Sequence, residues 1–300
     1  MNQILKVQSV GDYSSFVGHV DTHQFVAVID YAEVSPILHT KSEFSVYALF
    51  LLDDTLEDLT YGHSGYGYEK GTLVCVSPGQ TGGVDYNGKR FDRRGWALLF
   101  HPDLLQGTPL GYSMKEYSFF QYQTNEALYM TESEREIYIS LLLQLRRTLG
   151  QNNNKYRDSI IVTYIELILK YCKRFYDRQF TAQEASNHDL LKRFNHLLST
   201  YLNSERLVTE GIPTVAWCAK ELCLSPSYFG DLVKKETGIT ARDHIHHSII
   251  EMAKNKLING EQIIQIAYDL GFEYPQHLSR LFKKQTGCTP SEYIERISKA

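Results

Sequence analysis

The chain has 300 residues and a formal net charge of −4, from 31 lysines and arginines against 35 aspartates and glutamates. Its hydrophobic content of 43% and charged content of 22% are ordinary for a folded protein and exclude general disorder. This length suits two domains of usual size. The negative total charge argues at first sight against nucleic-acid binding, which depends on cationic surface.

The ends and the cysteines of the chain bear on its compartment. Residues 1–10 have no basic start followed by a long apolar run, so we expect no signal peptide. The longest apolar stretches, such as residues 46–52, are too short to span a bilayer. Five cysteines without a CxxC motif fit reduced, mostly buried thiols. We therefore expect a cytoplasmic protein with no membrane partner.

The first 125 residues carry most of the glycines and several short apolar runs bounded by turn residues. This pattern is typical of antiparallel strands in a sandwich or barrel. The clearest runs are residues 25–29, 46–50 and 72–76.

Two helical stretches follow the predicted strands. Residues 131–149 start with Thr131 and Glu134 at the spacing of a capping box and continue with apolar residues at helical period. A second helix is predicted from Tyr156 to about Phe175, and three asparagines between the two helices predict a helical hairpin. The hairpin either forms a dimer interface or only covers the barrel.

The polar segment 179–188 lacks hydrophobic periodicity and predicts a boundary between domains spanning 1–180 and 189–300. Residues 1–188 hold 17 basic and 22 acidic residues, whereas residues 189–300 hold 14 and 13. The acidity therefore belongs to the first part. The second part carries a net charge of about +1 and is predicted to be helical to its end.

An internal duplication determines the architecture of the second part. Residues 234–238 (KKETG) recur 49 positions later as residues 283–287 (KKQTG). Apolar positions recur at spacings of 48 or 49 residues: Ala219, Leu222, Leu224, Phe229, Leu232 and Val233 match Ala267, Leu270, Phe272, Leu278, Leu281 and Phe282.

Each copy predicts two short helices around a tight turn, and Gly271 is the expected stop of the first helix in copy two. A second helix with an outward polar and basic face is how a helix-turn-helix enters the major groove. A helix over residues 241–258, about 27 Å long, would separate the copies. The residues predicted at DNA are Pro226, Ser227, Gly230, Asp231, Lys234, Pro275, Gln276, Ser279, Arg280, Lys283 and Lys284.

Three segments of the second copy, residues 267–272 (AYDLGF), 277–284 (HLSRLFKK) and 287–294 (GCTPSEYI), are similar to the C-terminal signature of the AraC/XylS family of bacterial transcription regulators. The resemblance covers about residues 190–297. It implies binding to double-stranded DNA by a tandem helix-turn-helix domain, usually with activation of transcription through contact with RNA polymerase.

Residues 68–80 (YEKGTLVCVSPGQ) resemble, more loosely, the late strand pair of the cupin-like sensor domain of this family. In many members a helical hairpin after that domain forms a homodimer. The predicted fold class is therefore α+β: an N-terminal cupin-like β-barrel with a helical hairpin, for effector sensing and dimerisation, and a C-terminal all-α tandem helix-turn-helix domain.

The chemistry of the predicted recognition helices differs between the copies. Gln276 and Arg280 lie one turn apart, and their side chains pair bidentately with adenine and guanine respectively. Lys283 and Lys284 suit phosphates, although a solvated helix face is the alternative for all four. In copy one, Asp231 either accepts from a cytosine amino group or repels phosphate, so this helix is expected to contribute less base-specific affinity.

The candidate effector site lies in the first domain. Tyr31, Tyr47, Tyr66 and Tyr68 combine apolar area with a hydroxyl and suit a sugar or an aromatic metabolite, or else they fill the barrel. His39 corresponds to a cupin metal ligand, but the other ligands are missing, so a metal-free site is expected. The histidine cluster at 244, 246 and 247 also lacks further ligands, and no metal or other cofactor is expected.

These features predict a regulator, not an enzyme, in which an effector shifts the population between DNA-binding states. One alternative is an effector-independent regulator that is controlled by its abundance or by a partner protein. A cupin-type enzyme with an accessory helical domain is the other alternative.

Overall fold

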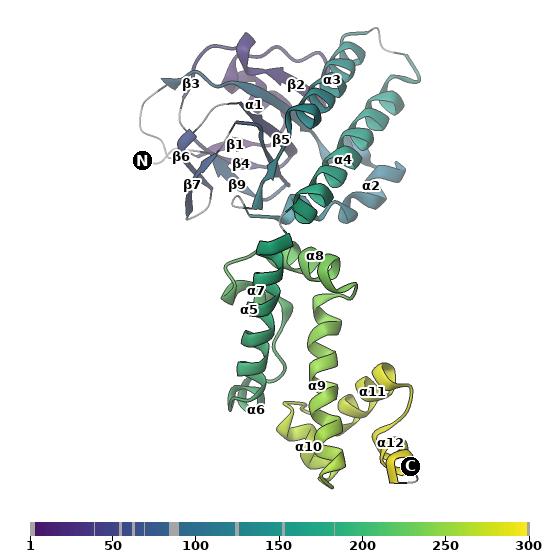
Figure 1. The fold of residues 1–300 in the computed structure, drawn as a ribbon. Helices are drawn as coiled ribbons and strands as arrows, with labels where there is room; N and C mark the ends of the chain where they lie inside the picture. The colour runs from purple at the N-terminus through teal and green to yellow at the C-terminus, as the bar shows by residue number, and fades with distance from the viewer. Residues whose placement is uncertain are drawn as a thin grey trace. The chain divides into compact units, whose positions relative to one another are not determined.

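A computed structural model describes residues 4–38, 40–53, 56–61, 64–68, 70–83, 90–123, 126–151, 154–182 and 184–298. The chain forms two compact units, Met1–Ala182 and Gln183–Ala300. The strands lie in the first unit, and the second unit is helical (Figure 1). None of the helices within the described ranges is long and apolar enough to cross a membrane.

The first unit contains strands, a helical hairpin and short helices. Its strands are β1 (Leu5–Val7), β2 (Val26–Asp30), β3 (Ile37–Leu38), β4 (Lys41–Phe44), β5 (Tyr47–Leu52), β6 (Leu56–Tyr61), β7 (Ser64–Tyr68), β8 (Thr72–Val76), β9 (Thr81–Gly83), β10 (Arg90–Phe91), β11 (Gly95–Phe100) and β12 (Leu128–Tyr129). Its helices are α1 (Val10–Val17), α2 (Pro109–Ser113), α3 (Glu132–Leu149) and α4 (Arg157–Ala182), with 3-10 turns η1 (Tyr31–Glu33), η2 (Pro102–Leu105), η3 (Met114–Glu116) and η4 (Ser118–Gln121).

The described strands form four separate sheets, not a closed barrel. The largest has the order β12-β8-β5-β11-β2 with antiparallel pairs throughout. A second sheet has the order β1-β4-β9 and includes one parallel pair, and β3–β10 and β6–β7 are two-stranded. The predicted strands are therefore present. Within the described ranges no closed barrel is found, because β12 and β2 each pair on one side only and closure requires continuous pairing.

The five-stranded sheet is buried on both faces. Residues 26–29 of β2 are all buried, which explains why this segment is a continuous apolar run instead of an alternating one. One face forms a core with α1 and β4, which contains Ala48, Phe50 and Ala97. The hairpin of α3 and α4 contacts β2 and β12. The hairpin thus covers part of this sheet, as one of the two sequence alternatives stated.

The hairpin begins as the sequence predicts. Thr131 Oγ1 accepts the backbone N–H of Glu134 at 3.3 Å, and the Glu134 carboxylate accepts the backbone N–H of Thr131 at 2.9 Å. This confirms the capping box.

The two compact units divide within the polar segment 179–188, and the described residues on either side of the division are helical. Helix α4 continues beyond Phe175 to Ala182, and α5 begins at Glu184. Gln179 is buried inside α4, where its amide accepts from the Tyr129 N–H at 2.7 Å and donates to the Ala127 carbonyl at 3.0 Å. A polar side chain with both partners satisfied is compatible with burial, and composition alone does not reveal such partners.

The second unit consists of helices around one hydrophobic core. They are α5 (Glu184–Leu202), α6 (Arg206–Glu210), α7 (Val215–Glu221), α8 (Pro226–Thr237), α9 (Ala241–Ile258), α10 (Ile263–Asp269), α11 (Pro275–Thr286) and α12 (Pro290–Ser298). Helix α9 has the bounds that the sequence predicts, and α8, α10, α11 and α12 all contact it (Figure 1). The equivalent residues Phe229 and Leu278, one from each copy, are both buried in this core.

Candidate nucleic-acid interface

The duplication places two helices of equal length, α8 and α11, each behind a tight turn. Each starts with a proline at its first position, where the missing N–H would have no helical partner. In α8 the Ser225 hydroxyl also accepts the Tyr228 N–H at 3.1 Å. Each helix ends at a glycine in the left-handed region, Gly238 with φ 74° and Gly287 with φ 79°.

Helix α11 presents an unpaired polar and basic face. Leu278 and Phe282 are buried, whereas the exposed set is Gln276, Arg280, Lys283 and Lys284. Within the described part of the chain, none of these four forms an ion pair or a side-chain hydrogen bond. Lys256 on α9 differs, because it pairs with Glu261 and Asp269, each at 2.9 Å. The cations of α11 therefore remain available to an external anion.

Two other predicted residues of α11 have local structural roles. Pro275 is the first residue of the helix and is half-buried. The half-buried Ser279 hydroxyl donates to the Pro275 carbonyl at 3.3 Å, within its own helix. The structure thus places Gln276, Arg280 and the two lysines outward and turns Ser279 toward its own backbone.

The corresponding face of α8 is less polar. Pro226 and Lys234 are exposed, whereas Ser227 and Asp231 are half-buried and each already interacts within the protein. No protein atom lies within 4 Å of a Cβ built on Gly230. Packing within the chain therefore does not require glycine at this helix position, where it costs about 1 kcal/mol relative to alanine.

Of the histidines on α9, His246 lies near Lys284 of α11, and His244 lies beside Asn195 of α5. Burial lowers the pKa of the His246 imidazole, and the positive charges of Arg242 and Lys284 lower it further against the opposing effect of Asp243. Burial also lowers the pKa of His244, whose Nε2 lies 2.9 Å from Asn195 Oδ1. Both imidazoles are therefore neutral near pH 7 in the free protein.

Two aromatic side chains at the start of α11 were not predicted. Tyr274 is 48% exposed, and its ring meets that of the exposed His277 edge to face, with centroids 5.4 Å apart. They flank Gln276 at the N-terminal end of the helix, the part of a recognition helix that contacts base edges. In the sequence, Tyr274 directly precedes Pro275 and His277 directly follows Gln276, and this position could have identified them.

The turn of each copy requires a residue in the left-handed region. Gly271, with φ 75°, ends α10 as predicted. The equivalent residue in copy one is Cys223, which has φ 59° and is the only residue other than glycine with positive φ in the described ranges. This conformation costs an L-residue about 1–2 kcal/mol. The sequence signal was the pairing of Cys223 with Gly271 in the 48-residue repeat.

Cys223→Gly is expected to raise the free energy of unfolding of the second unit by about 0.5–1 kcal/mol, because relief of the strain exceeds the entropy that glycine adds to the unfolded chain. Urea unfolding followed by Trp217 fluorescence, in a Trp96→Phe background, measures it. Cys223→Ala is the control, because it removes the thiol and keeps the strain. Equal stability of the glycine and alanine variants would contradict a strained turn.

The structure describes two of the predicted effector side chains, Tyr31 and Tyr47, and their surroundings differ. Tyr31 is 2% exposed, and its hydroxyl lies 2.5 Å from that of Tyr13. Tyr47 is half-buried, stacks on Phe100 with ring centroids 5.1 Å apart, and lines a surface hollow of about 250 Å³. The side chains of Tyr66 and Tyr68 in β7, and all of residue 39, lie outside the described residues.

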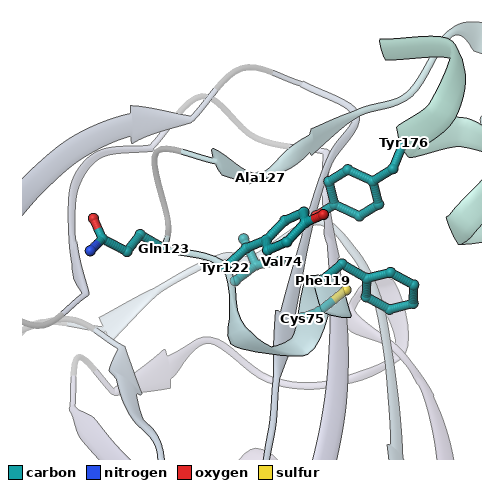
Figure 2. A pocket seen from close by; sticks show the side chains of 7 residues that line it. All are labelled: Val74, Cys75, Phe119, Tyr122, Gln123, Ala127 and Tyr176. Atoms are coloured by element: carbon teal, nitrogen blue, oxygen red, sulfur yellow. The ribbon is translucent and has the colours of Figure 1, made fainter. Parts of the chain in front are cut away.

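A second, smaller cavity lies between β8, η4 and α4. Figure 2 shows the rings of Tyr122 and Tyr176 meeting there beside the Cys75 thiol. Their centroids are 5.3 Å apart in an edge-to-face arrangement, and Phe119 stacks on Tyr176. The cavity measures about 10 Å³, which is space for one water molecule. It is therefore too small for a sugar or an aromatic metabolite.

Residues 218–296 match the family model of a helix-turn-helix domain. The uncharacterized transcriptional regulatory protein YesN of Bacillus subtilis is 36% identical over 84 residues, which are 27% of this chain and only 23% of that protein. The arabinose operon regulatory protein of Escherichia coli is 23% identical over 224 residues, which are 74% of this chain and 71% of that protein.

Similar solved chains include a regulator from Chromobacterium violaceum described as having an AraC-type DNA-binding domain. It is 18% identical and covers 37% of this chain and 95% of its own, with a TM-score of 0.32. ToxT from Vibrio cholerae is 15% identical and covers 90% of this chain and 96% of its own, with a TM-score of 0.30.

The family match includes both recognition helices, so the second unit is a helix-turn-helix domain of the kind that binds DNA. This domain is similar to that of transcription regulators, among them the arabinose operon regulatory proteins of Escherichia coli and Salmonella typhimurium.

Proposed function

We propose that this protein regulates transcription by placing α8 and α11 in successive major grooves of double-stranded DNA. The main support is the exposed face of α11, where Gln276, Arg280, Lys283 and Lys284 have no partner in the described part of the chain. Three of the four are cations, and no acidic residue occurs between positions 276 and 284. Such a face has the charge and the donors that phosphates and base edges require.

The two recognition helices contribute unequally to DNA binding. Arg280 pairs with guanine, Gln276 with adenine, and Lys283 and Lys284 with phosphates. Helix α8 contributes mainly Lys234 and a close backbone approach at Gly230, with Pro226, Ser227 and Asp231 beside them. The support for this division is that Ser227 and Asp231 already interact within the protein. In contrast, Gln276, Arg280, Lys283 and Lys284 of α11 form no ion pair and no side-chain hydrogen bond in the described part of the chain.

Residues 1–180 act as a sensor and dimerisation domain. This domain releases or aligns the DNA-binding domain of residues 189–300. Large apolar side chains exposed on the hairpin support dimerisation: Leu143 is 42%, Ile160 43% and Leu167 38% exposed. The hollow beside Tyr47 supports a ligand in this unit. The output is activation through contact with RNA polymerase.

Genome-wide footprinting of the bound sites tests the function as a whole. Protected sites upstream of genes, with half-sites in successive major grooves, are expected. Protection without sequence preference would contradict regulation by base readout.

Lys283→Ala is expected to weaken binding to all DNA sequences alike and to reduce the slope of log affinity against log salt by about one, because one phosphate contact is lost. Fluorescence anisotropy at several salt concentrations measures both effects. Lys192→Ala on α5 is the control, because it removes the same charge from an exposed position outside α8 and α11. A loss confined to one sequence, or an equal loss in the control, would contradict the phosphate role.

A further inference from the structure

The imidazole of His246 on α9 is left without a partner. Its Nδ1 atom is buried and accepts or donates no hydrogen bond. In the described part of the chain, the side chain forms no other hydrogen bond and no ion pair. The residue as a whole is only half-buried, so Nε2 is the ring nitrogen that remains for an external group.

Two cations from different helices lie around this imidazole. Arg242 precedes His246 by four residues on α9, the spacing at which side chains share one helix face. Lys284 belongs to α11, which packs against α9, and its charge acts on the His246 ring. Both cations are exposed, and neither has an ion-pair or hydrogen-bond partner among the described residues. These three side chains are called the Arg242–His246–Lys284 cluster below.

The carboxylates near the cluster are engaged elsewhere. Asp243 opposes the effect of the two cations on His246, but its Oδ2 accepts the Thr240 hydroxyl at 2.7 Å. It forms no ion pair with the cluster within the described ranges. On the other helices packed against α9, Asn187 donates to Glu236 of α8, Lys256 pairs with Asp269 of α10, and Glu292 of α12 accepts the Thr289 N–H. The cluster therefore lacks a counter-ion from the protein.

The same surroundings keep His246 neutral in the free protein. Burial lowers the pKa of this imidazole, and the charges of Arg242 and Lys284 lower it further. Protonation would also place an N–H at the buried Nδ1, where no acceptor is present. A phosphate held by the two cations reverses this balance, because an opposite charge within about 4–6 Å raises the pKa of an imidazole.

We propose that the Arg242–His246–Lys284 cluster binds one backbone phosphate of DNA beside α11, and that His246 takes up a proton from solvent when the phosphate binds. Phosphate contacts of this kind fix the orientation of a recognition helix in its groove. The proposal adds α9 to the interface and makes DNA affinity depend on pH. It rests on the proposed DNA-binding function and names a means by which that function is regulated.

The direction of the pH effect follows from proton linkage. Between the pKa of His246 in the free protein and its higher pKa in the complex, only the complex holds the proton. Affinity for DNA therefore rises as the pH falls through this interval. We expect the natural protein to bind about three- to tenfold more tightly at about pH 6 than at about pH 7.5, because one pKa unit corresponds to a tenfold change.

Fluorescence anisotropy of the full chain on a footprinted duplex, at constant ionic strength, measures the affinity at both pH values. A scrambled duplex is expected to show the same ratio, because a phosphate contact does not depend on sequence. His246→Gln is expected to abolish the rise and to keep the affinity that the natural protein has at the higher pH. His246→Arg carries a permanent charge and is expected to bind tightly at both pH values.

Two other imidazoles are the matched controls. His247 is the next residue on α9, with an exposed ring whose Nε2 lies 3.9 Å from Glu251. His277 is exposed on α11. His247→Gln and His277→Gln are both expected to keep the pH response. The inference is overturned if the natural protein shows no rise, if the rise persists in His246→Gln, if either control abolishes it, or if it is confined to one DNA sequence.

Calorimetry in Pipes and bis-tris buffers, which differ in ionisation enthalpy, counts the protons taken up on binding. The natural protein is expected to take up a fraction of one proton at about pH 6.5, and His246→Gln none. A merely structural role of His246 would change the affinity and leave this count unchanged, which overturns the inference.

The failure of this inference differs from that of the proposed function. Sequence-specific DNA binding without proton uptake contradicts the role of His246 and leaves the regulator function in place. Absence of binding to every duplex at both pH values contradicts the regulator function and this inference with it.

Discussion

Gly271→Ala is expected to destabilise the second unit by about 2–4 kcal/mol. The φ of 75° costs an alanine about 1–2 kcal/mol. In addition, the new Cβ would lie 2.2 Å from the Leu207 carbonyl oxygen and 3.0 Å from the Gly211 Cα, so the backbone has to move. Overpacking of this kind costs about 1–3 kcal/mol, and the stiffer unfolded chain returns less than 1 kcal/mol.

Gly287→Ala separates the two contributions to this effect. Gly287 has φ 79°, but no atom lies within 4 Å of a Cβ built there, so only the strain of about 1–2 kcal/mol applies. Urea unfolding monitored by Trp217, with Trp96 replaced by Phe, compares the two variants. A difference in unfolding free energy below about 0.5 kcal/mol, which is the usual scatter between independent sites, would show that the contact of α10 with α6 relaxes without cost.

The structural consequence reaches the DNA-binding face. Gly271 joins α10 to α11 and packs against the end of α6, where the Tyr201 hydroxyl donates to the Gly211 carbonyl at 3.0 Å. A displaced turn would tilt α11. We therefore expect Gly271→Ala to lower specific DNA affinity even at temperatures where the variant stays folded.

Arg280→Ala is expected to lower affinity for the specific site by about 1–3 kcal/mol, or roughly 5- to 150-fold, and to relax the preference at one base pair. Arg280 is exposed on α11 and has no partner in the described part of the chain, so its removal leaves no buried group unsatisfied. Binding to a library randomised at each position of the footprinted site measures both effects.

Two further variants control for charge and for geometry. Arg296→Ala removes an exposed arginine from α12 and is expected to change sequence preference at no position. Arg280→Lys keeps the charge and loses the two-pronged donor, so it is expected to retain salt dependence and lose discrimination. An unchanged base preference in Arg280→Ala would remove this residue from the readout of sequence.

Much of the second unit was predictable because its signals are local. The repeat of residues 234–238 at 283–287 located both recognition helices, and the apolar period of residues 241–258 predicted α9 with its observed bounds. Proline at the start of each recognition helix and glycine at its end are signals within a single turn. The total charge of −4 does not exclude a cationic face, because it averages an acidic first part with a second part of net charge about +1.

The first unit was less predictable. Gln179 lies in the polar stretch where the sequence places the domain boundary, yet its side chain is buried in a helix and bonds to the backbone of residues 127 and 129. The effector tyrosines were predicted from residue type alone. Tyr31 is buried, and its hydroxyl already lies within hydrogen-bond distance of the Tyr13 hydroxyl. Residue type does not reveal which distant side chain satisfies a polar group.

The sequence by itself determined three central strands, the hairpin of α3 and α4, the duplication and the bounds of α9, because periodicity and caps are encoded by neighbours in the chain. Only the tertiary structure decided that Gly271 has no room for a side chain while its counterpart Cys223 is tolerated. Only the tertiary structure places the Arg93 guanidinium over the rings of Tyr31 and Phe50. The physical reason is that steric space and charge pairing depend on residues far apart in sequence, which only the folded chain brings together.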